Sequence, residues 1–189
     1  ELMFLESRDS GGTIRRAAGM DIPGMIDLIG YYADLIRNKN NVVDLATKPL
    51  PEPTHTQVWY EPIGVCGLIT PWNFPIFIAA AKIFPALAAG NTIVIKPSEY
   101  TPASTTRLVQ LLSQVLPKGV LNLVNGDGAQ VGAAMTTHPD IGKISFTGST
   151  RIGQLIQKTA ADQCKLVSLE LGGKGPAIVM EDADLDLAA

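Results

Sequence analysis

Apolar and polar positions recur with two different periods along the chain, and the changes of period divide it into elements. Residues 19–38 carry apolar side chains at three- and four-residue steps, which predicts an amphipathic helix. A second helix is predicted over residues 76–89, an alanine-rich stretch that ends at Gly90, a residue typical of helix C-termini. Between them, the prolines of residues 48–53 exclude a helix, and residues 54–60 alternate as an exposed strand does.

From residue 63 onwards, short apolar runs alternate with longer amphipathic stretches. The runs predict strands at 63–69, 91–95, 120–124, 141–146, 166–171 and 177–180. The stretches predict helices at 101–116, with Thr101 as N-cap and Pro102 in the first turn, at 129–136 and at 150–161. This alternation favours an α/β fold with a doubly wound, mostly parallel sheet. Ligands bind such sheets at the carboxyl ends of the strands, so the candidate loops are 70–75, 96–101, 125–128 and 147–150.

Composition narrows the class of function. The formal net charge of -3 and the scattered basic residues disfavour binding to nucleic acid or to an anionic membrane. The most apolar stretch, residues 74–95, is interrupted by Lys82 and so predicts no membrane span. Cys66 and Cys164 lie far apart without metal-type spacing, so we expect neither a disulfide framework nor a metal site. A reducing cytoplasm is the expected location.

The loop after the first buried strand places an amide between two aromatic residues. It reads TPWNFP over residues 70–75, and its two prolines restrict the backbone. A rigidly held Asn73 amide is a suitable donor to a developing oxyanion. The alternative is that Asn73 only caps the helix that follows.

Two further loops suggest contacts to a dinucleotide. In KPSE, residues 96–99, the Glu99 carboxylate can accept both hydroxyls of an adenosine ribose and Lys96 can offer a positive charge; the alternative is a solvated ion pair at the surface. The segment GDGAQVG, residues 126–132, has one residue too many for the dinucleotide fingerprint, and its alternative is a tight strand-to-helix turn.

The last two motifs suggest a site for a pyrophosphate and a residue that accepts a proton. FTGSTRIG, residues 146–153, passes from a strand into a helix, so exposed amides and the Ser149 hydroxyl suit a pyrophosphate, with simple helix capping as the alternative. Glu170 lies between two leucines, where apolar surroundings would raise the pKa of its carboxyl and suit a general base. Its alternative is an ion pair with Lys174.

The segments TPWNFP, GNTIVIKPSE, VNGDG, FTGSTRIG and LELGGK occur together in this order, and together they resemble the aldehyde dehydrogenase superfamily over essentially the whole chain. The resemblance implies a Rossmann-like fold and NAD as cofactor, with NADP as an alternative. It divides the chain into a helical part of the cofactor-binding domain (1–47), an oligomerisation arm (48–62) and a Rossmann-like domain (63–189).

The resemblance also implies roles for individual residues. Asn73 is expected to form the side-chain half of an oxyanion hole, and Glu170 to activate water. Lys96 and Glu99 are expected to contact the adenosine ribose, and the charge of Glu99 favours NAD because it would repel a 2′-phosphate. Further cofactor contacts are expected at Ile69, Thr70, Pro71, Trp72, Ser98, Gly126, Gly148, Ser149, Gly153, Leu171 and Gly172. Lys82 matches a family lysine to which we assign no role.

Two features depart from the family pattern. Arg151 stands where many relatives carry Glu, which makes the phosphate loop more basic and eases binding of NADP. The family's catalytic cysteine lies downstream of LELGGK, but only 19 residues follow Glu170 (189 − 170) and none is cysteine. Cys66 and Cys164 both precede Glu170, and we expect them to be buried structural thiols. The catalytic cysteine domain is therefore expected to be absent.

The reaction implied for the parent enzyme is oxidation of an aldehyde. A thiolate attacks the aldehyde, Asn73 steadies the oxyanion, hydride passes to NAD(P)+, and water activated by Glu170 releases the acid. The chain is expected to supply the cofactor cleft, oxyanion donor and base, to be inactive alone, and to form a homodimer or homotetramer through residues 48–62. The alternative is a catalytically inactive relative that serves as a cofactor-binding or interaction module. A hydrolase that uses Ser149 is disfavoured because a G-x-S-x-G elbow is missing.

Overall fold

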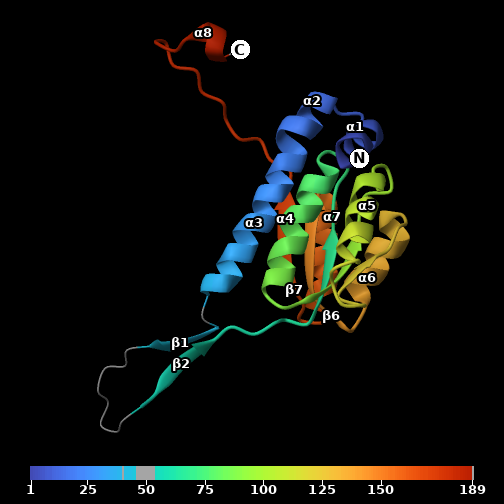
Figure 1. The fold of residues 1–189 in the computed structure, drawn as a ribbon, viewed down its shortest axis with the longest axis vertical. Coiled ribbons are helices and arrows are strands. Elements are labelled where there is room, and N and C mark those ends of the chain that lie inside the picture. Colours follow the sequence, from blue (N-terminus) through green and yellow to red (C-terminus); the bar gives the residue numbers. More distant parts are fainter. Residues whose placement is uncertain (40, 46–53, 189) are drawn as a thin grey trace.

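The computed structural model describes residues 1–39, 41–45 and 54–188, which form an α/β fold around a five-stranded sheet (Figure 1). The strands of this sheet are β3 (Val65–Ile69), β4 (Thr92–Lys96), β5 (Leu121–Leu123), β6 (Ile141–Gly148) and β7 (Leu166–Leu171). Their order is β5-β4-β3-β6-β7, and every neighbouring pair is parallel. This arrangement confirms the predicted parallel sheet.

Helices pack on both faces of the sheet, as a doubly wound fold requires. Helices α4 (Pro75–Ala88) and α5 (Ala103–Leu112) pack on one face, and α6 (Ala133–Thr137) and α7 (Thr150–Ala161) pack on the other. Helix α3 (Ile22–Asn38) packs on α4, α1 (Leu2–Ser10) packs on α4 and α5, and α2 (Ile14–Arg16) packs on α1, whereas α8 (Leu185–Ala188) lies away from the sheet at the end of an extended segment (Figure 1). Two π-helical turns are η1 (Ala17–Asp21) and η2 (Gly128–Gly132). One apolar core lies between α3, α4, α5 and the sheet, and centres on Ile76, Ile83 and Ile93. A second core lies beneath α6 and α7 and centres on Ile144.

Helix α5 differs from its prediction at both ends. It begins at Ala103 and ends at Leu112, and Thr101 is not its N-cap. Instead the Asp9 carboxylate accepts a hydrogen bond from the Ala103 N–H (2.7 Å), while the Thr101 hydroxyl donates to the carbonyl of Trp72 (3.3 Å). A carboxylate from a distant helix has thus taken the capping role, which a local sequence pattern does not reveal.

Two peripheral segments were wrongly predicted. Residues 177–180 form no strand; Ile178 is 77% exposed and Met180 64%, because this run finds no neighbouring strand with which to pair. Conversely, β1 (Val42–Leu45) was missed and pairs antiparallel with β2 (Thr56–Trp59) in an arm that projects from the body (Figure 1). Residues 42–45 are all exposed and show no alternation of burial. The predicted proline-rich path at 48–53 lies outside the described residues.

The two cysteines do not share one environment. Cys66 is buried in β3, as expected, but Cys164 is exposed and has a positive φ of 52°. A tight turn between α7 and β7 places Cys164 at the surface, so it is not the buried thiol that we predicted. Among the described residues, none of the helices is long and apolar enough to cross a membrane.

Helix α1 holds the amino ends of two other helices. The carboxylate of Glu6, which is fully buried, accepts hydrogen bonds from the Ile76 N–H in the first turn of α4 (3.3 Å) and from the Ser104 hydroxyl in α5 (2.5 Å). Asp9, one turn further along α1, accepts from Ala103. Negative charge is favourable at a helix amino end because the first N–H groups lack partners within the helix. Helix α1 therefore acts as a shared cap for α4 and α5.

Candidate active site

The loops after β3 and β6 leave the sheet side by side, where the order of the strands reverses direction. The chain runs from β3 outward to β4 and β5, then returns to place β6 on the other side of β3. Ile69 at the end of β3 is paired with Lys96 of β4 and with Phe146 of β6. Such a switch point is where open α/β sheets bind ligands. The predicted loops 70–75, 96–101 and 147–150 therefore begin at one edge.

The loop at 70–75 presents its amide to solvent. Asn73 is exposed, and α4 has Phe74 as its N-cap without a side-chain capping bond, so the helix-capping alternative for Asn73 does not hold. Trp72 is 59% exposed, Pro71 is half-buried and Ile69 is buried. Thr70 is only 3% exposed; its N–H donates to the Lys96 carbonyl (3.1 Å), but its buried hydroxyl has no hydrogen-bond partner.

A buried charge cluster lies beneath this loop. The Arg16 guanidinium stands 4.7 Å from the centre of the Phe74 ring, directly after Asn73 in sequence. Arg16 pairs with the fully buried Asp21 (Nε to Oδ2, 3.0 Å) and lies 4.0 Å from Glu6. Burial raises the pKa of the Glu6 carboxyl, although bonds from Ser104 and Ile76 oppose the rise. The cluster thus fixes the point at which the loop enters α4.

Lys96 and Glu99 form a pair that is only partly at the surface. The Lys96 side chain is 2% exposed, and its Nζ donates to the Pro97 carbonyl (2.8 Å) and to Glu99 (3.3 Å). The Glu99 side chain is 40% exposed. A hydrogen bond from its own backbone N–H and the charge of Lys96 lower the pKa of Glu99. Ser98 is buried and accepts from the Tyr100 N–H (3.3 Å). The solvated-pair alternative is therefore wrong for Lys96, and Glu99 remains an available acceptor.

The segment at 126–132 forms a tight turn into η2, which was the alternative to a dinucleotide fingerprint. Asp127 caps the turn by accepting from the Gln130 N–H (2.7 Å). Gly126 has φ of 151°, and a Cβ there would lie 2.4 Å from Val131. The conformation and the close contact both explain the glycine without a ligand.

Ser149 is the N-cap of α7, which confirms the capping role given as an alternative. Its hydroxyl accepts from the Ile152 N–H (3.4 Å), and the residue is exposed. Gly148 ends β6 with the Phe146 ring where a Cβ would stand (2.5 Å), and the buried Gly153 receives the Leu171 side chain in the same way (2.5 Å). These two glycines thus permit close packing around the amino end of α7.

Glu170 is exposed, so the apolar surroundings expected for it are not present in this chain. Its side chain leaves β7 on the opposite face from those of Leu169 and Leu171, because neighbouring residues of a strand alternate. Glu170 is paired in register with Thr147 of β6, and the structure assigns no ion pair to it with Lys174. Leu171 (37% exposed) and the exposed Gly172 continue towards residues 173–184.

Glu170 lines a cleft of about 640 Å³ beside α4, whose floor is formed by β3, β6 and β7. Its polar lining residues are Lys82, Asn91, Lys143, Ser145, Thr147, Ser168 and Glu170. Lys82 is the residue that sequence reasoning left without a role, and it is 9% exposed in the wall of this cleft. Its position inside an otherwise apolar helix was the signal available in the sequence. Asn73 is not among the residues that line this cleft.

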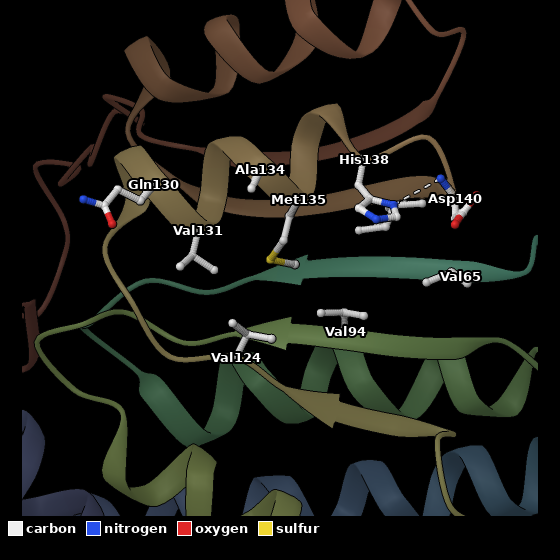
Figure 2. Close-up of a pocket in the computed structure, with 10 residues that line it drawn as sticks. Val65, Val94, Val124, Gln130, Val131, Ala134, Met135, His138 and Asp140 are labelled. Carbon is white, nitrogen blue, oxygen red and sulfur yellow. Dashed lines mark hydrogen bonds between the residues drawn. The ribbon is translucent and has the colours of Figure 1, made fainter.

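A second hollow lies on the other side of the sheet. It has a volume of about 490 Å³ between α6 and strands β3 and β4, and valine, methionine and alanine side chains line most of it (Figure 2). None of the residues predicted to bind a cofactor lines it. We therefore place the candidate site at the switch point and in the adjoining cleft.

Comparison with known proteins adds to this geometry. A model of the aldehyde dehydrogenase family matches residues 1–189. The betaine aldehyde dehydrogenase of Bacillus subtilis is 45% identical over the whole chain, and the match covers 38% of that protein. The retinaldehyde dehydrogenase 3 of Mus musculus is 46% identical over 99% of the chain, and the match covers 36% of that protein. A crystal structure of Staphylococcus aureus betaine aldehyde dehydrogenase in complex with NAD+ superposes with a TM-score of 0.93 at 40% identity, over 99% of the chain and 37% of that structure. The chain thus spans little more than a third of the length of these relatives.

Proposed function

Because the chain belongs to the aldehyde dehydrogenase family, we propose that it binds NAD at the switch point of its sheet and contributes an oxyanion donor and a general base to the oxidation of an aldehyde. The observation that carries the proposal is the convergence at one sheet edge of three elements: the exposed Asn73 loop, the Lys96–Glu99 pair and the amino end of α7.

The amino end of α7 suits the pyrophosphate of a dinucleotide. Helix α7 runs for 12 residues from its N-cap Ser149, so its first N–H groups and the helix dipole favour an anion there. Arg151 in the first turn is exposed and adds positive charge. We therefore assign the pyrophosphate to residues 148–151.

The Lys96–Glu99 pair suits the adenosine ribose. The charge of Lys96 and a backbone hydrogen bond keep Glu99 ionised, and an ionised carboxylate accepts hydrogen bonds from two neighbouring hydroxyls. The same charge repels a 2′-phosphate, which favours NAD over NADP. The unpaired, buried hydroxyl of Thr70, next to Lys96, offers one further polar group that a ligand can satisfy.

Asn73 and Glu170 would act on the substrate. NAD, when bound, accepts the hydride that the substrate carbon loses. The exposed Asn73 amide donates a hydrogen bond to the oxygen on which negative charge develops. Glu170 takes a proton from water, which then attacks the acyl carbon to release the acid. In this proposal the remaining chemistry, including a nucleophilic thiolate, comes from outside residues 1–189.

We further propose that residues 63–189 form the NAD-binding domain, with residues 1–47 as its helical supplement and residues 48–62 as part of an arm for self-association. The described strand within 48–62, β2, supports this role: it is exposed on nearly all positions, Trp59 is 64% exposed, and it pairs with the equally exposed β1 just before the arm. An exposed two-stranded ribbon with free edges is suited to pairing with a second copy.

Isothermal titration of the chain with NAD and with NADP tests the cofactor assignment. We expect NAD to bind at least about tenfold more tightly than NADP, because Glu99 opposes a 2′-phosphate, and Glu99→Gln to reduce this ratio to about threefold or less. Glu181→Gln, which removes an equally negative and exposed side chain far along the sequence, is the matched control and should leave the ratio unchanged.

A folded chain that binds neither dinucleotide would overturn the proposal and would favour the alternative of an interaction module. Unchanged discrimination in Glu99→Gln would contradict the ribose assignment alone.

A further inference from the structure

Lys82 is a buried amine in the wall of the cleft that contains Glu170. It lies on α4, which otherwise packs apolar side chains against the sheet, and only 9% of the residue is exposed. Its Nζ donates a hydrogen bond to the Ser145 hydroxyl on β6 (2.8 Å). The cleft has a volume of about 640 Å³, enough to hold a small organic molecule next to this amine.

The surroundings of Lys82 favour its neutral form. The pKa of Lys82 is lowered to about 8: burial is the largest cause, the negative charge of Glu170 opposes it, and the positive charge of Lys143 adds to it. The remaining titratable group that lines the cleft is the Cys66 thiol, whose pKa burial raises. At pH 7 roughly a tenth of the Lys82 side chains is then neutral, about 300-fold more than for an ordinary lysine.

We propose that Lys82 is a carbonyl-reactive amine that captures aldehydes entering this cleft as a reversible imine. The choice of aldehydes as the class of ligand rests on the proposed function. The cleft geometry supports the proposal: the amine lines a cavity with a hydroxyl at 2.8 Å, and it shares that cavity with the carboxylate of Glu170.

The step is balanced without any further reactant. The Nζ lone pair attacks the carbonyl carbon, and the carbonyl oxygen takes up a proton to give a carbinolamine. Loss of one water then leaves a C=N bond between the aldehyde carbon and Nζ, and no electrons are transferred. Glu170 stabilises the protonated form of this imine by its negative charge.

Lys165 is a natural comparison within the same chain. Like Lys82 it is 9% exposed, and burial lowers its pKa as well. Its Nζ, however, donates to the His138 carbonyl between α6 and β7, and Lys165 does not line the cleft. If burial alone produced reactivity, both lysines would react; if the cleft is required, only Lys82 will.

The experiment is reductive trapping on the intact chain. Propanal is added with sodium cyanoborohydride, whose hydride converts an imine to a stable secondary amine, and peptide mass spectrometry follows the rate at each lysine from pH 6 to pH 10. At pH 7 we expect Lys82 to be labelled at least about tenfold faster than the exposed Lys158, and Lys165 to be labelled more slowly than Lys158. The Lys82 rate should level off with a midpoint near pH 8, and Glu170→Gln should move that midpoint to a lower pH.

Equal rates at Lys82 and Lys158, equal rates at Lys82 and Lys165, or a midpoint that rises in Glu170→Gln would overturn the inference. The titration with NAD remains a separate measurement. If the chain binds NAD but Lys82 is not labelled selectively, only the proposal of an imine at Lys82 is refuted. If Lys82 is labelled selectively but the chain does not bind NAD, only the cofactor assignment is refuted.

Discussion

Replacement of Ser149 by Glu is expected to weaken NAD binding by at least about 100-fold, or about 2.7 kcal/mol, because it places a carboxylate where the proposal puts a pyrophosphate. Ser149 is exposed at the amino end of α7, so the longer side chain fits without displacing the core. The negative charge favours this helix end and opposes the loss of the Ser149 cap, so the variant is expected to stay folded. Isothermal titration gives the affinity, and the thermal midpoint reports the stability.

The matched control is Ser149→Asn, which keeps a neutral capping side chain. It should bind NAD within about threefold of the unchanged chain, since asparagine caps a helix about as well as serine. If Ser149→Glu also binds within this range, the pyrophosphate does not lie at the amino end of α7.

Replacement of Glu6 by Ala is expected to lower the free energy of unfolding by about 2–4 kcal/mol. The substitution leaves the Ile76 N–H and the Ser104 hydroxyl buried without their acceptor, and it removes a negative charge close to Arg16. Both α4 and α5 would lose a bond to Glu6, although α5 keeps the bond from its Ala103 N–H to Asp9. Urea denaturation, followed by circular dichroism, measures the change.

Glu6→Gln keeps the shape of the side chain and removes its charge, so it separates the effects of the two on the free energy of unfolding. Its carbonyl can still accept from the Ile76 N–H, so we expect less than half of the loss seen with alanine.

Burial raises the pKa of Glu6 in the folded chain, so the folded chain holds this proton more tightly than the unfolded chain. The stability of the unchanged chain should therefore fall, relative to Glu6→Gln, as the pH rises from about 4.5 through the folded pKa. If the stability of the unchanged chain instead rose relative to Glu6→Gln over this pH range, the raised pKa of the buried Glu6 carboxyl would be contradicted.

The sheet and the loops at its edge could be predicted from the sequence because their signals are local. Residues 63–69 and 91–95 are apolar runs, and Gly90, with φ of 79°, ends the preceding helix as expected. Parallel strands carry their carboxyl ends to one edge of a sheet, so the sequence alone predicts that the loops that follow β3, β4 and β6 lie together. The proposed cofactor groups of Lys96, Glu99 and Ser149 follow from this argument.

The features that sequence reasoning missed depend on distant partners. The caps from Glu6 and Asp9 join residues 70 to 98 positions apart, and such pairings leave no periodic signal. Glu170 has leucine neighbours in sequence, but the alternation of a strand sends its side chain to the opposite, polar face. The role of Lys82 could not be read from α4 alone, since Ser145, Lys143 and Glu170 come from two other strands.

The shared cap from α1 also sets an order of events on the ribosome. The nine residues of α1 are synthesised long before Ile76, Ala103 and Ser104, which supply its hydrogen-bond partners. A helix this short is only marginally stable in isolation. Glu6 can bond to Ile76 only after about 70 further residues have emerged, and the bonds to Ala103 and Ser104 form only after more than 90, so α1 completes its docking after α4 and α5 have been synthesised.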